Sequence, residues 1–316
     1  MAEPTPPHAA KAQRRFLDTD PRMIETFGDP FRPLEPECTV VQFNRPLTQA
    51  QLAKAGELMR GRPDVELYVY DPAGTDLDFL KFFPALRRLH LSLYRLEDIA
   101  GFAHLDGSLE ELVFAATRKG FSLRFLDRFP RLSKLFLQRH RKDLRAVERL
   151  AGLTSLGLSG LTLPDLSLAL PLTGLRSLSI LLGGTTNLAL LPRLPALESL
   201  FLMRITKLAD VSVLGELANL KTLRLDWMRN VTSLPSFAGL ARLESVELDT
   251  MKGVADLAPV AAAPALRRLA VTSMPQLGID AFRCLLGHAS LAELWAYTGR
   301  QRVNDAVKAM FPGIAR

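Results

Sequence analysis

A short leucine pattern, L-x-x-L-x-L with conservative replacements, recurs along most of this 316-residue chain and constrains its fold more than any other feature. Successive patterns begin 21 to 25 residues apart, and most begin 22 or 23 apart. A single match would be weak evidence in a leucine-rich chain, whereas ten matches in nearly constant phase indicate a repeat protein. The ten patterns begin at Leu86, Leu109, Leu132, Leu153, Leu175, Leu197, Leu220, Leu243, Leu266 and Leu291.

Each repeat is expected to contribute one short strand. With the first leucine as position one, the fourth and sixth positions, such as Leu223 and Leu225, alternate with outward-facing neighbours at the strand period of two. After the strand, apolar residues recur about every third position, as in Met228, Val231 and Leu234, which is typical of 3₁₀-like turns. One repeat buries too little apolar surface to offset the entropy of ordering it, so stability must come from stacking.

Two further strands are predicted before the regular set, because residues 41–46 align with residues 67–72, 26 positions later. Between them, Thr48 and Gln51 resemble a capping box that opens a helix reaching to about Arg60. The predicted fold class is therefore an α/β solenoid. It has a concave parallel sheet of about twelve short strands and a convex side of short 3₁₀ and helical turns.

Three parts are expected along the chain: a flexible N-terminal arm and irregular cap over 1–37, the solenoid over 38–300, and a short C-terminal capping helix over 301–316. Neither a signal-peptide core nor a stretch of about 18 uncharged apolar residues is present in the sequence. Cys38 and Cys284 fall at opposite ends of the expected strand stack, which excludes a disulfide between them and favours a reducing compartment. We therefore expect a cytoplasmic protein without membrane contact, and delivery as a secreted effector stays open.

From about residue 38 to residue 316 the repeats resemble the leucine-rich-repeat family, in particular its short-repeat bacterial branch, to which the internalins belong. That resemblance implies a right-handed horseshoe or arc used mainly for protein recognition. The family's ninth repeat position is commonly asparagine or cysteine, so this chain lacks the asparagine ladder, and the resemblance alone leaves the curvature open. The ninth position is occupied here by Tyr94, Thr117, His140, Leu161, Gly183, Ile205, Met228, Met251, Met274 and Gly299.

No spacing in the sequence is typical of catalysis or of a metal site. Cys284 and His288 stand four apart on an expected helical segment, but zinc needs three or four ligands. The pair Gly183-Gly184 has no further glycines at the spacing of a dinucleotide fingerprint, and we interpret it as a turn after a strand. We therefore expect no enzymatic activity, no metal and no cofactor.

The concave face is the predicted binding surface, with positions five and seven pointing into it and positions eight and nine forming its rim. All six Trp and Tyr residues occupy these positions. Strand propensity is one explanation, and an interface anchored by aromatic residues is the other. Arg224 has an alternative role, which is to pair with Asp226 or Glu247 and so satisfy the sheet face. The candidate partner-binding residues are Tyr68, Tyr70, His90, Phe136, Phe201, Met203, Arg204, Arg224, Asp226, Trp227, Glu247, Asp249, Trp295 and Tyr297, and Tyr94 is the sixth aromatic.

The net charge of +7 is concentrated in residues 81–150, which carry 15 Lys and Arg against 8 Asp and Glu. The cations near the expected strand exits form either a solvated face or a basic patch for nucleic acid or a phosphate ligand. Nucleic acid is the less favoured partner because this segment has few aromatic residues between its cations. We predict a non-catalytic module that binds an unknown protein through its concave face, as an adaptor, inhibitor or effector, with its oligomeric state open. The basic residues are Arg118, Lys119, Arg139, Arg141, Lys142 and Arg145.

Overall fold

A computed structural model describes residues 34, 36–71 and 73–316 of the chain. It divides into two compact units, Met1–Leu132 and Ser133–Arg316. The predicted solenoid over 38–300 therefore spans both units. Most of the predicted N-terminal arm, residues 1–33 and 35, lies outside the described residues.

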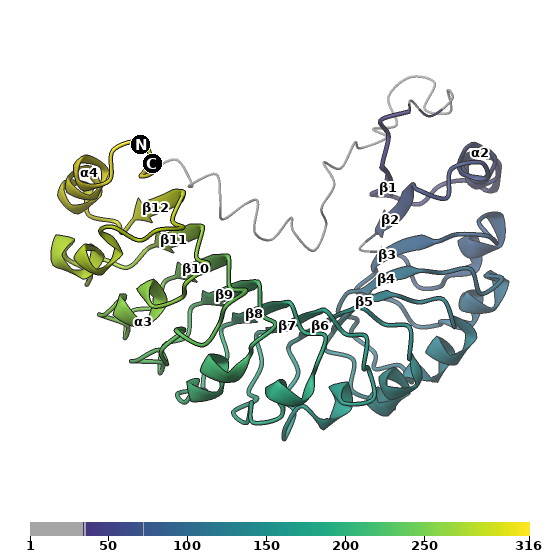
Figure 1. The fold of residues 1–316 in the computed structure, drawn as a ribbon. Coiled ribbons are helices and arrows are strands. Elements are labelled where there is room, and N and C mark those ends of the chain that lie inside the picture. The colour runs from purple at the N-terminus through teal and green to yellow at the C-terminus, as the bar shows by residue number, and fades with distance from the viewer. Residues whose placement is uncertain (1–33, 35, 72) are drawn as a thin grey trace. The chain divides into compact units, whose positions relative to one another are not determined.

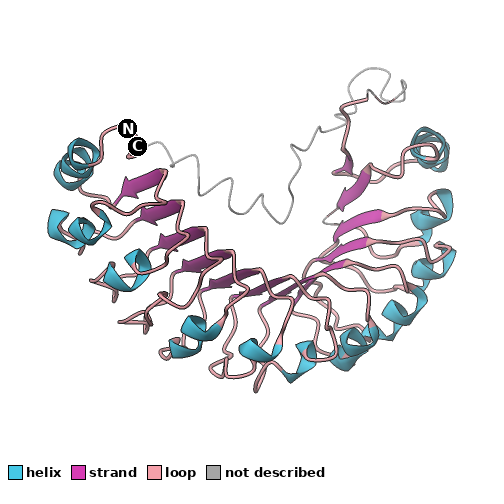
Figure 2. Cartoon of the chain, viewed as in Figure 1, coloured by secondary structure: helices cyan, strands magenta, loops and turns pink. Residues whose placement is uncertain are grey.

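The first unit contains four parallel strands that pair in chain order (Figure 1). Val41 pairs with Leu67, which confirms the alignment of the two strands that precede the regular repeats. Helices follow the strands and cover the opposite side of the stack (Figure 2). The strands are β1 (Val40–Phe43), β2 (Glu66–Tyr70), β3 (Arg88–Ser92) and β4 (Glu111–Phe114), and the helices are α2 (Gln49–Met59), η1 (Asp78–Phe82), η2 (Ala100–His104) and η3 (Leu123–Arg128).

The predicted capping box opens helix α2. The Thr48 side chain accepts a hydrogen bond from the Gln51 backbone N–H at 3.3 Å, and the Thr48 N–H donates to the Gln51 side chain at 2.9 Å. Both donors would otherwise lack a partner at a helix N-terminus. The helix ends at Met59, one residue before the predicted limit at Arg60.

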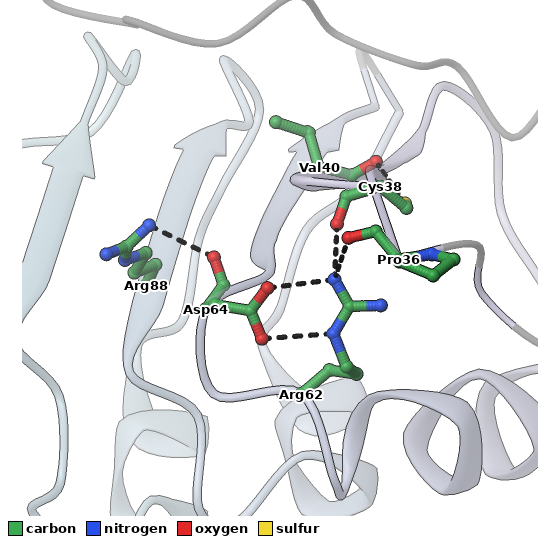
Figure 3. A network of polar contacts seen from close by, with 6 residues as sticks. All are labelled: Pro36, Cys38, Val40, Arg62, Asp64 and Arg88. Atoms are coloured by element: carbon green, nitrogen blue, oxygen red, sulfur yellow. Dashed lines mark hydrogen bonds and ion pairs between the residues drawn. The ribbon is translucent and has the colours of Figure 1, made fainter.

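An arginine clamp holds the chain that leads into β1. Arg62 donates through Nε and Nη2 to the Asp64 carboxylate, at 3.0 Å and 2.8 Å. The same Nη2 donates to the backbone carbonyls of Pro36 and Cys38, at 3.1 Å and 2.8 Å (Figure 3). Arg88 donates to the Asp64 carbonyl at 3.0 Å. One guanidinium therefore ties residues 36–38 to the turn before β2.

The second unit contains eight parallel strands, again paired in chain order. Within this unit the strands line the concave side and short helices follow the convex side (Figure 2). Together with the first unit this makes twelve parallel strands, the predicted number. The elements are β5 (Lys134–Gln138), η4 (Leu144–Arg149), β6 (Ser155–Ser159), η5 (Ser167–Ala169), β7 (Ser177–Leu181), η6 (Leu191–Arg193), β8 (Ser199–Met203), η7 (Ser212–Glu216), β9 (Thr222–Asp226), β10 (Ser245–Asp249), α3 (Ala258–Ala261), β11 (Arg268–Thr272), η8 (Ile279–Leu285), β12 (Glu293–Tyr297) and α4 (Gln301–Met310).

Apolar side chains take the place of the missing asparagine ladder. Ile205, Met228, Met251 and Met274 stand at the ninth position, and all four are fully buried. The backbone at the strand exits is satisfied by other backbone groups. In seven successive repeats of the second unit, the N–H of the eighth-position residue donates to the seventh-position carbonyl of the next repeat, as from Trp227 to Asp249 at 2.9 Å. In these repeats the hydrogen-bond ladder extends one residue past the strand without an asparagine.

A left-handed backbone conformation makes that extra bond. In seven successive repeats of the second unit the eighth-position residue has a positive φ, between 51° and 66°. Only one of the seven is glycine, although each other residue type costs about 1–2 kcal/mol there. The row therefore carries stored strain. Its members are Arg139, Gly160, Leu182, Arg204, Trp227, Thr250 and Ser273.

The C-terminal segment is helical only over α4, within the predicted capping helix of 301–316. Phe311 is the C-cap of the helix, and Pro312 and Gly313, the latter with φ 87°, come next and are incompatible with its continuation. The tail then forms a parallel bridge to β12. The Leu294 N–H donates to the Ile314 carbonyl at 2.8 Å, and the Arg316 N–H donates to the Leu294 carbonyl at 2.9 Å. A short extended segment therefore caps β12 together with the helix.

Candidate binding face

Two rows of side chains lie on the concave side of β8 to β12, and we call them the β8–β12 face. Neighbours within each row are adjacent because the strands pair in register. Most of the candidate partner-binding residues are therefore brought together on one sheet. The fifth-position row is Phe201, Arg224, Glu247, Ala270 and Trp295, and the seventh-position row is Met203, Asp226, Asp249, Thr272 and Tyr297.

Ion pairs run across this face from β9 to β12. Arg224 lies 3.3 Å from Asp226 and 3.7 Å from Glu247, so its alternative pairing role is realised with both carboxylates. Arg268 continues the chain, 3.7 Å from Glu247 and 3.9 Å from Glu293. Sequence reasoning missed Arg268 and Glu293. Both stand at the third repeat position, which has the same parity as the fifth and seventh and therefore faces the same side.

Guanidinium groups lie over several aromatic rings of the face. Arg224 is 4.5 Å from the centroid of Phe201, and Arg204 is 5.1 Å from that of Trp227. Each arrangement places a positive charge over a ring at cation–π distance. The contacts join neighbouring repeats and hold large side chains in defined positions.

Asp226 is the most perturbed group of the face. It is only 6% exposed, and burial, followed by the charge of Asp249, raises its pKa from 3.8 to about 6. Arg224 and Arg204 oppose that shift. Its Oδ2 lies 3.3 Å from the Arg224 guanidinium, whereas Oδ1 has no hydrogen-bond partner in the described part of the chain. Asp226 is therefore a buried carboxylate whose bonding capacity is half used.

The candidate residues of the first unit are Tyr68, Tyr70 and His90, and they differ in exposure. The rings of Tyr68 and His90 stack with centroids 4.0 Å apart, and burial raises the Tyr68 pKa. His90 is itself buried, with its Nδ1 3.7 Å from Glu66 and its Nε2 3.2 Å from Ser92. It therefore offers a partner little contact surface. Tyr70, by contrast, is 49% exposed.

Comparison with solved structures bears on the fold. An internalin, InlF, from Listeria monocytogenes is 20% identical, with a TM-score of 0.53, over 78% of this chain and 70% of the internalin. The chain has a leucine-rich-repeat fold. Internalin C2 of the same organism is 19% identical, with a TM-score of 0.41, over 68% of this chain and 81% of that one. A leucine-rich-repeat protein of Leptospira interrogans is 14% identical, with a TM-score of 0.45, over the full length of both chains. No family model and no curated protein matches the sequence.

Exposed apolar side chains of this leucine-rich-repeat chain gather where strands end. Among the described residues, six large apolar side chains are exposed, and five of these occupy position seven, eight or nine of a repeat. The sixth, Leu286, directly follows η8 on the convex side. The sequence pattern had identified the aromatic members but not Leu182. The five are Tyr70, Tyr94, Leu182, Trp227 and Tyr297.

Phe136 is the candidate residue nearest the start of the second unit. It occupies the fifth position of its repeat on β5 and pairs in register with Gly157 on β6. Its ring is partly buried. Phe136 therefore lies on the concave side of the repeats, as predicted, but three strands away from β8.

The candidate basic residues divide between the two units. Arg118 and Lys119 belong to the first unit, where they contact a Glu97 side-chain oxygen at 3.1 Å and the Glu97 carbonyl at 2.7 Å. In the second unit, Arg141 donates to the Gly160 carbonyl at 3.5 Å, and Arg145 lies 3.9 Å from Glu148. Arg139 and Lys142 belong to the second unit as well. Several of these cations thus bind oxygens of their own chain.

The expected helical segment does not extend over both Cys284 and His288. Helix η8 ends at Leu285, so His288 lies beyond it, and its Nε2 is 3.0 Å from the Ala263 carbonyl. Cys38 and Cys284 are both free. Within the described ranges, no three His, Cys, Asp or Glu residues are grouped to hold a metal ion. Nor does that part of the chain contain a helix with the length and apolar character needed to cross a membrane.

Proposed function

We propose that this leucine-rich-repeat protein is a non-catalytic binding protein that recognises another protein through its concave side, chiefly the β8–β12 face. The observation that carries this proposal is that two exposed aromatic side chains, Trp227 and Tyr297, stand at the carboxyl ends of β9 and β12, beside the ion-paired residues of this face. Trp, Tyr and Arg are enriched at protein–protein interfaces. Aromatic anchors also lose little conformational entropy when a partner covers them.

Backbone strain supports the same proposal. Leu182 and Trp227 hold left-handed conformations that glycine would adopt without cost, and both side chains are 42% exposed. The left-handed conformation serves the hydrogen-bond ladder, but the stability of the repeat does not explain why an exposed Leu or Trp, and not glycine, adopts it. A partner that contacts these side chains would explain why they are retained.

The contacts of the basic residues make nucleic acid a weaker candidate, because several of those cations already bind oxygens of the protein. The role that fits a rigid concave sheet best is that of an adaptor, an inhibitor or an effector acting in a cytoplasm. Each of these roles requires a stable contact with one folded or extended protein partner.

Capture from the native lysate followed by mass spectrometry tests the proposal, with the intact chain as bait. Trp227→Ala and Trp295→Ala are the concave variants, and Glu216→Ala on η7 is the convex control. For the partner recovered, each concave change should weaken binding by about 30-fold, as expected for a true anchor. Thermal melting verifies that each variant is folded. If both concave variants bind normally while the convex variant fails, the concave side is not the binding surface.

A further inference from the structure

We infer that the partner presents a lysine or arginine side chain to Asp226 and Asp249 on the β8–β12 face. This inference rests on the proposed function and adds the chemistry of the contact to it. The two carboxylates are adjacent, because Asp226 of β9 pairs in register with Asp249 of β10. Both stand at the seventh repeat position and therefore face the concave side.

Among the described residues, the carboxylates of this face outnumber the cations that pair with them. Arg224 and Arg268 are shared among three carboxylates, those of Asp226, Glu247 and Glu293. Among the described residues, Asp249 forms no ion pair, and its Oδ1 accepts only the Thr250 hydroxyl, at 2.7 Å. The register places Asp226 on one side of it and Thr272 on the other. Asp249 thus has a like charge as its neighbour and no cation of its own.

A second observation is the unpartnered oxygen of Asp226. The residue is more than nine-tenths buried, yet Oδ1 has no hydrogen-bond partner in the described part of the chain. A buried carboxylate oxygen without a donor is costly. Ammonium and guanidinium groups carry several N–H donors, so one such group can serve Asp249 and the vacant oxygen together.

The nearby cations do not supply Asp249 with an ion pair or the Asp226 Oδ1 with a donor in the described part of the chain. Arg204 of the β8 repeat lies over the Trp227 ring, and Arg224 lies over Phe201 while it pairs with Glu247 as well. Both lower the Asp226 pKa, but burial and the Asp249 charge outweigh them. On β11, Arg268 is directed to Glu247 and Glu293. Within the described part of the chain, Asp249 therefore has no paired cation, and one oxygen of Asp226 has no donor.

The exposed rings of Trp227 and Tyr297 complete the contact. Each is at least 40% exposed; Trp227 directly follows Asp226 at the end of β9, and Tyr297 ends β12 in the same row as Asp249. Lysine and arginine bury a long aliphatic stem along apolar surface while the charged end reaches a carboxylate. Aromatic and acidic groups on one face therefore suit a basic side chain better than a purely apolar or an acidic one.

The test uses random peptides displayed on phage and selected on the intact chain. The strongest binder is synthesised with its basic residue, and again with norleucine or citrulline in that place. Calorimetry measures both peptides against wild type, Asp249→Asn and the convex control Glu216→Gln. We expect a conserved Lys or Arg in the selected peptides. The neutral analogue should bind wild type about tenfold or more weakly, and Asp249→Asn should abolish most of that difference.

The pH dependence of peptide affinity is a second measurement, which a contact made by packing alone would not change. Binding a cation favours ionised Asp226, so affinity for the basic peptide should fall about tenfold from neutral pH to about pH 5. Asp226→Asn should flatten that profile. Glu216→Gln removes the same charge elsewhere and should leave both affinity and profile unchanged.

The outcomes separate this inference from the proposed function. If selected peptides lose affinity for Trp227→Ala but tolerate both the neutral analogue and Asp249→Asn, the basic contact is refuted and the binding face stands. If they bind Trp227→Ala, Trp295→Ala and Asp249→Asn as well as wild type, both are refuted. A selection that enriches acidic peptides, or none, also overturns the inference.

Discussion

The guanidinium of Arg224 lies 4.5 Å from the ring centroid of Phe201, its register partner on the preceding strand. The same group lies between Asp226 on its own strand and Glu247 on the next. One side chain thus joins three successive repeats on the concave side. Because its neighbours are partly or fully buried, removal of Arg224 should lower the free energy of unfolding more than removal of a surface charge would.

Arg224→Met should lower the free energy of unfolding by about 3 kcal/mol, because it leaves two buried or partly buried carboxylates without their shared cation. Urea denaturation measures the loss. Asp226→Asn in the same chain should restore part of it, since the uncompensated charge is then gone. Equal unfolding midpoints for wild type and Arg224→Met would show that the pairing contributes nothing.

Stability should depend on pH through Asp226, whose pKa is raised to about 6 by burial and by Asp249. Because the folded pKa exceeds the unfolded one, the folded chain binds the proton more tightly. The resulting stabilisation is absent above about pH 6 and grows as the pH falls towards about 4. Asp226→Asn removes this contribution. The free energy of unfolding of the variant, relative to that of wild type, should therefore be higher at about pH 7.5 than at about pH 4.5. Urea titrations of both proteins check this, and parallel profiles would contradict it.

Leu182→Gly should leave the free energy of unfolding unchanged or raise it by up to about 1 kcal/mol, because it relieves a left-handed φ of 53° at an exposed side chain. Gly160→Ala at the same position of the preceding repeat should lower it. Its φ is +66°, and a Cβ there would lie 2.7 Å from Arg139 Cγ. Thermal melting of the pair measures both. A destabilised Leu182→Gly with a neutral Gly160→Ala would contradict the strain assigned to this row.

Arg62→Met should release residues 36–38 from the turn before β2, since this guanidinium donates to the Pro36 and Cys38 carbonyls. Cys38 is buried, so its alkylation reports the release. In a Cys284→Ser background, where Cys38 is the only thiol, we expect modification at least about tenfold faster than in the parent. Arg60→Met, a nearby exposed arginine, is the matched control. Unchanged rates in Arg62→Met would mean that other contacts hold the segment.

Leu200→Asp should unfold the second unit, because Leu200 is fully buried on β8 and an aspartate there would be an unpaired buried charge. Far-UV circular dichroism follows the loss of strand signal. An exposed change on the convex side, Glu216→Gln, should melt like wild type. A Leu200→Asp variant that melts at the parent temperature would mean that the fourth repeat position does not face the core.

The sequence by itself determined the number of strands, their parallel order and the side chains that face the core. These features follow from two periods, the alternation of two within a strand and the spacing of 22 or 23 between repeats. A shift of either period would expose a whole row of leucines, so the pattern admits one arrangement. The sequence alone also predicted the capping box of Thr48 and Gln51, because both partners lie within one helical turn.

Only the tertiary structure decided how side chains of different repeats meet. Arg224 had several possible partners in the sequence, and the stacked strands bring it to Phe201, Asp226 and Glu247 together. His90 occupied a concave position in the pattern but is buried under Tyr68. The left-handed row and the buried methionines at position nine depend on the fit of one repeat against the next. Stacking sets such contacts between residues 22 or 23 positions apart, and periodicity alone does not specify which long side chains pair there.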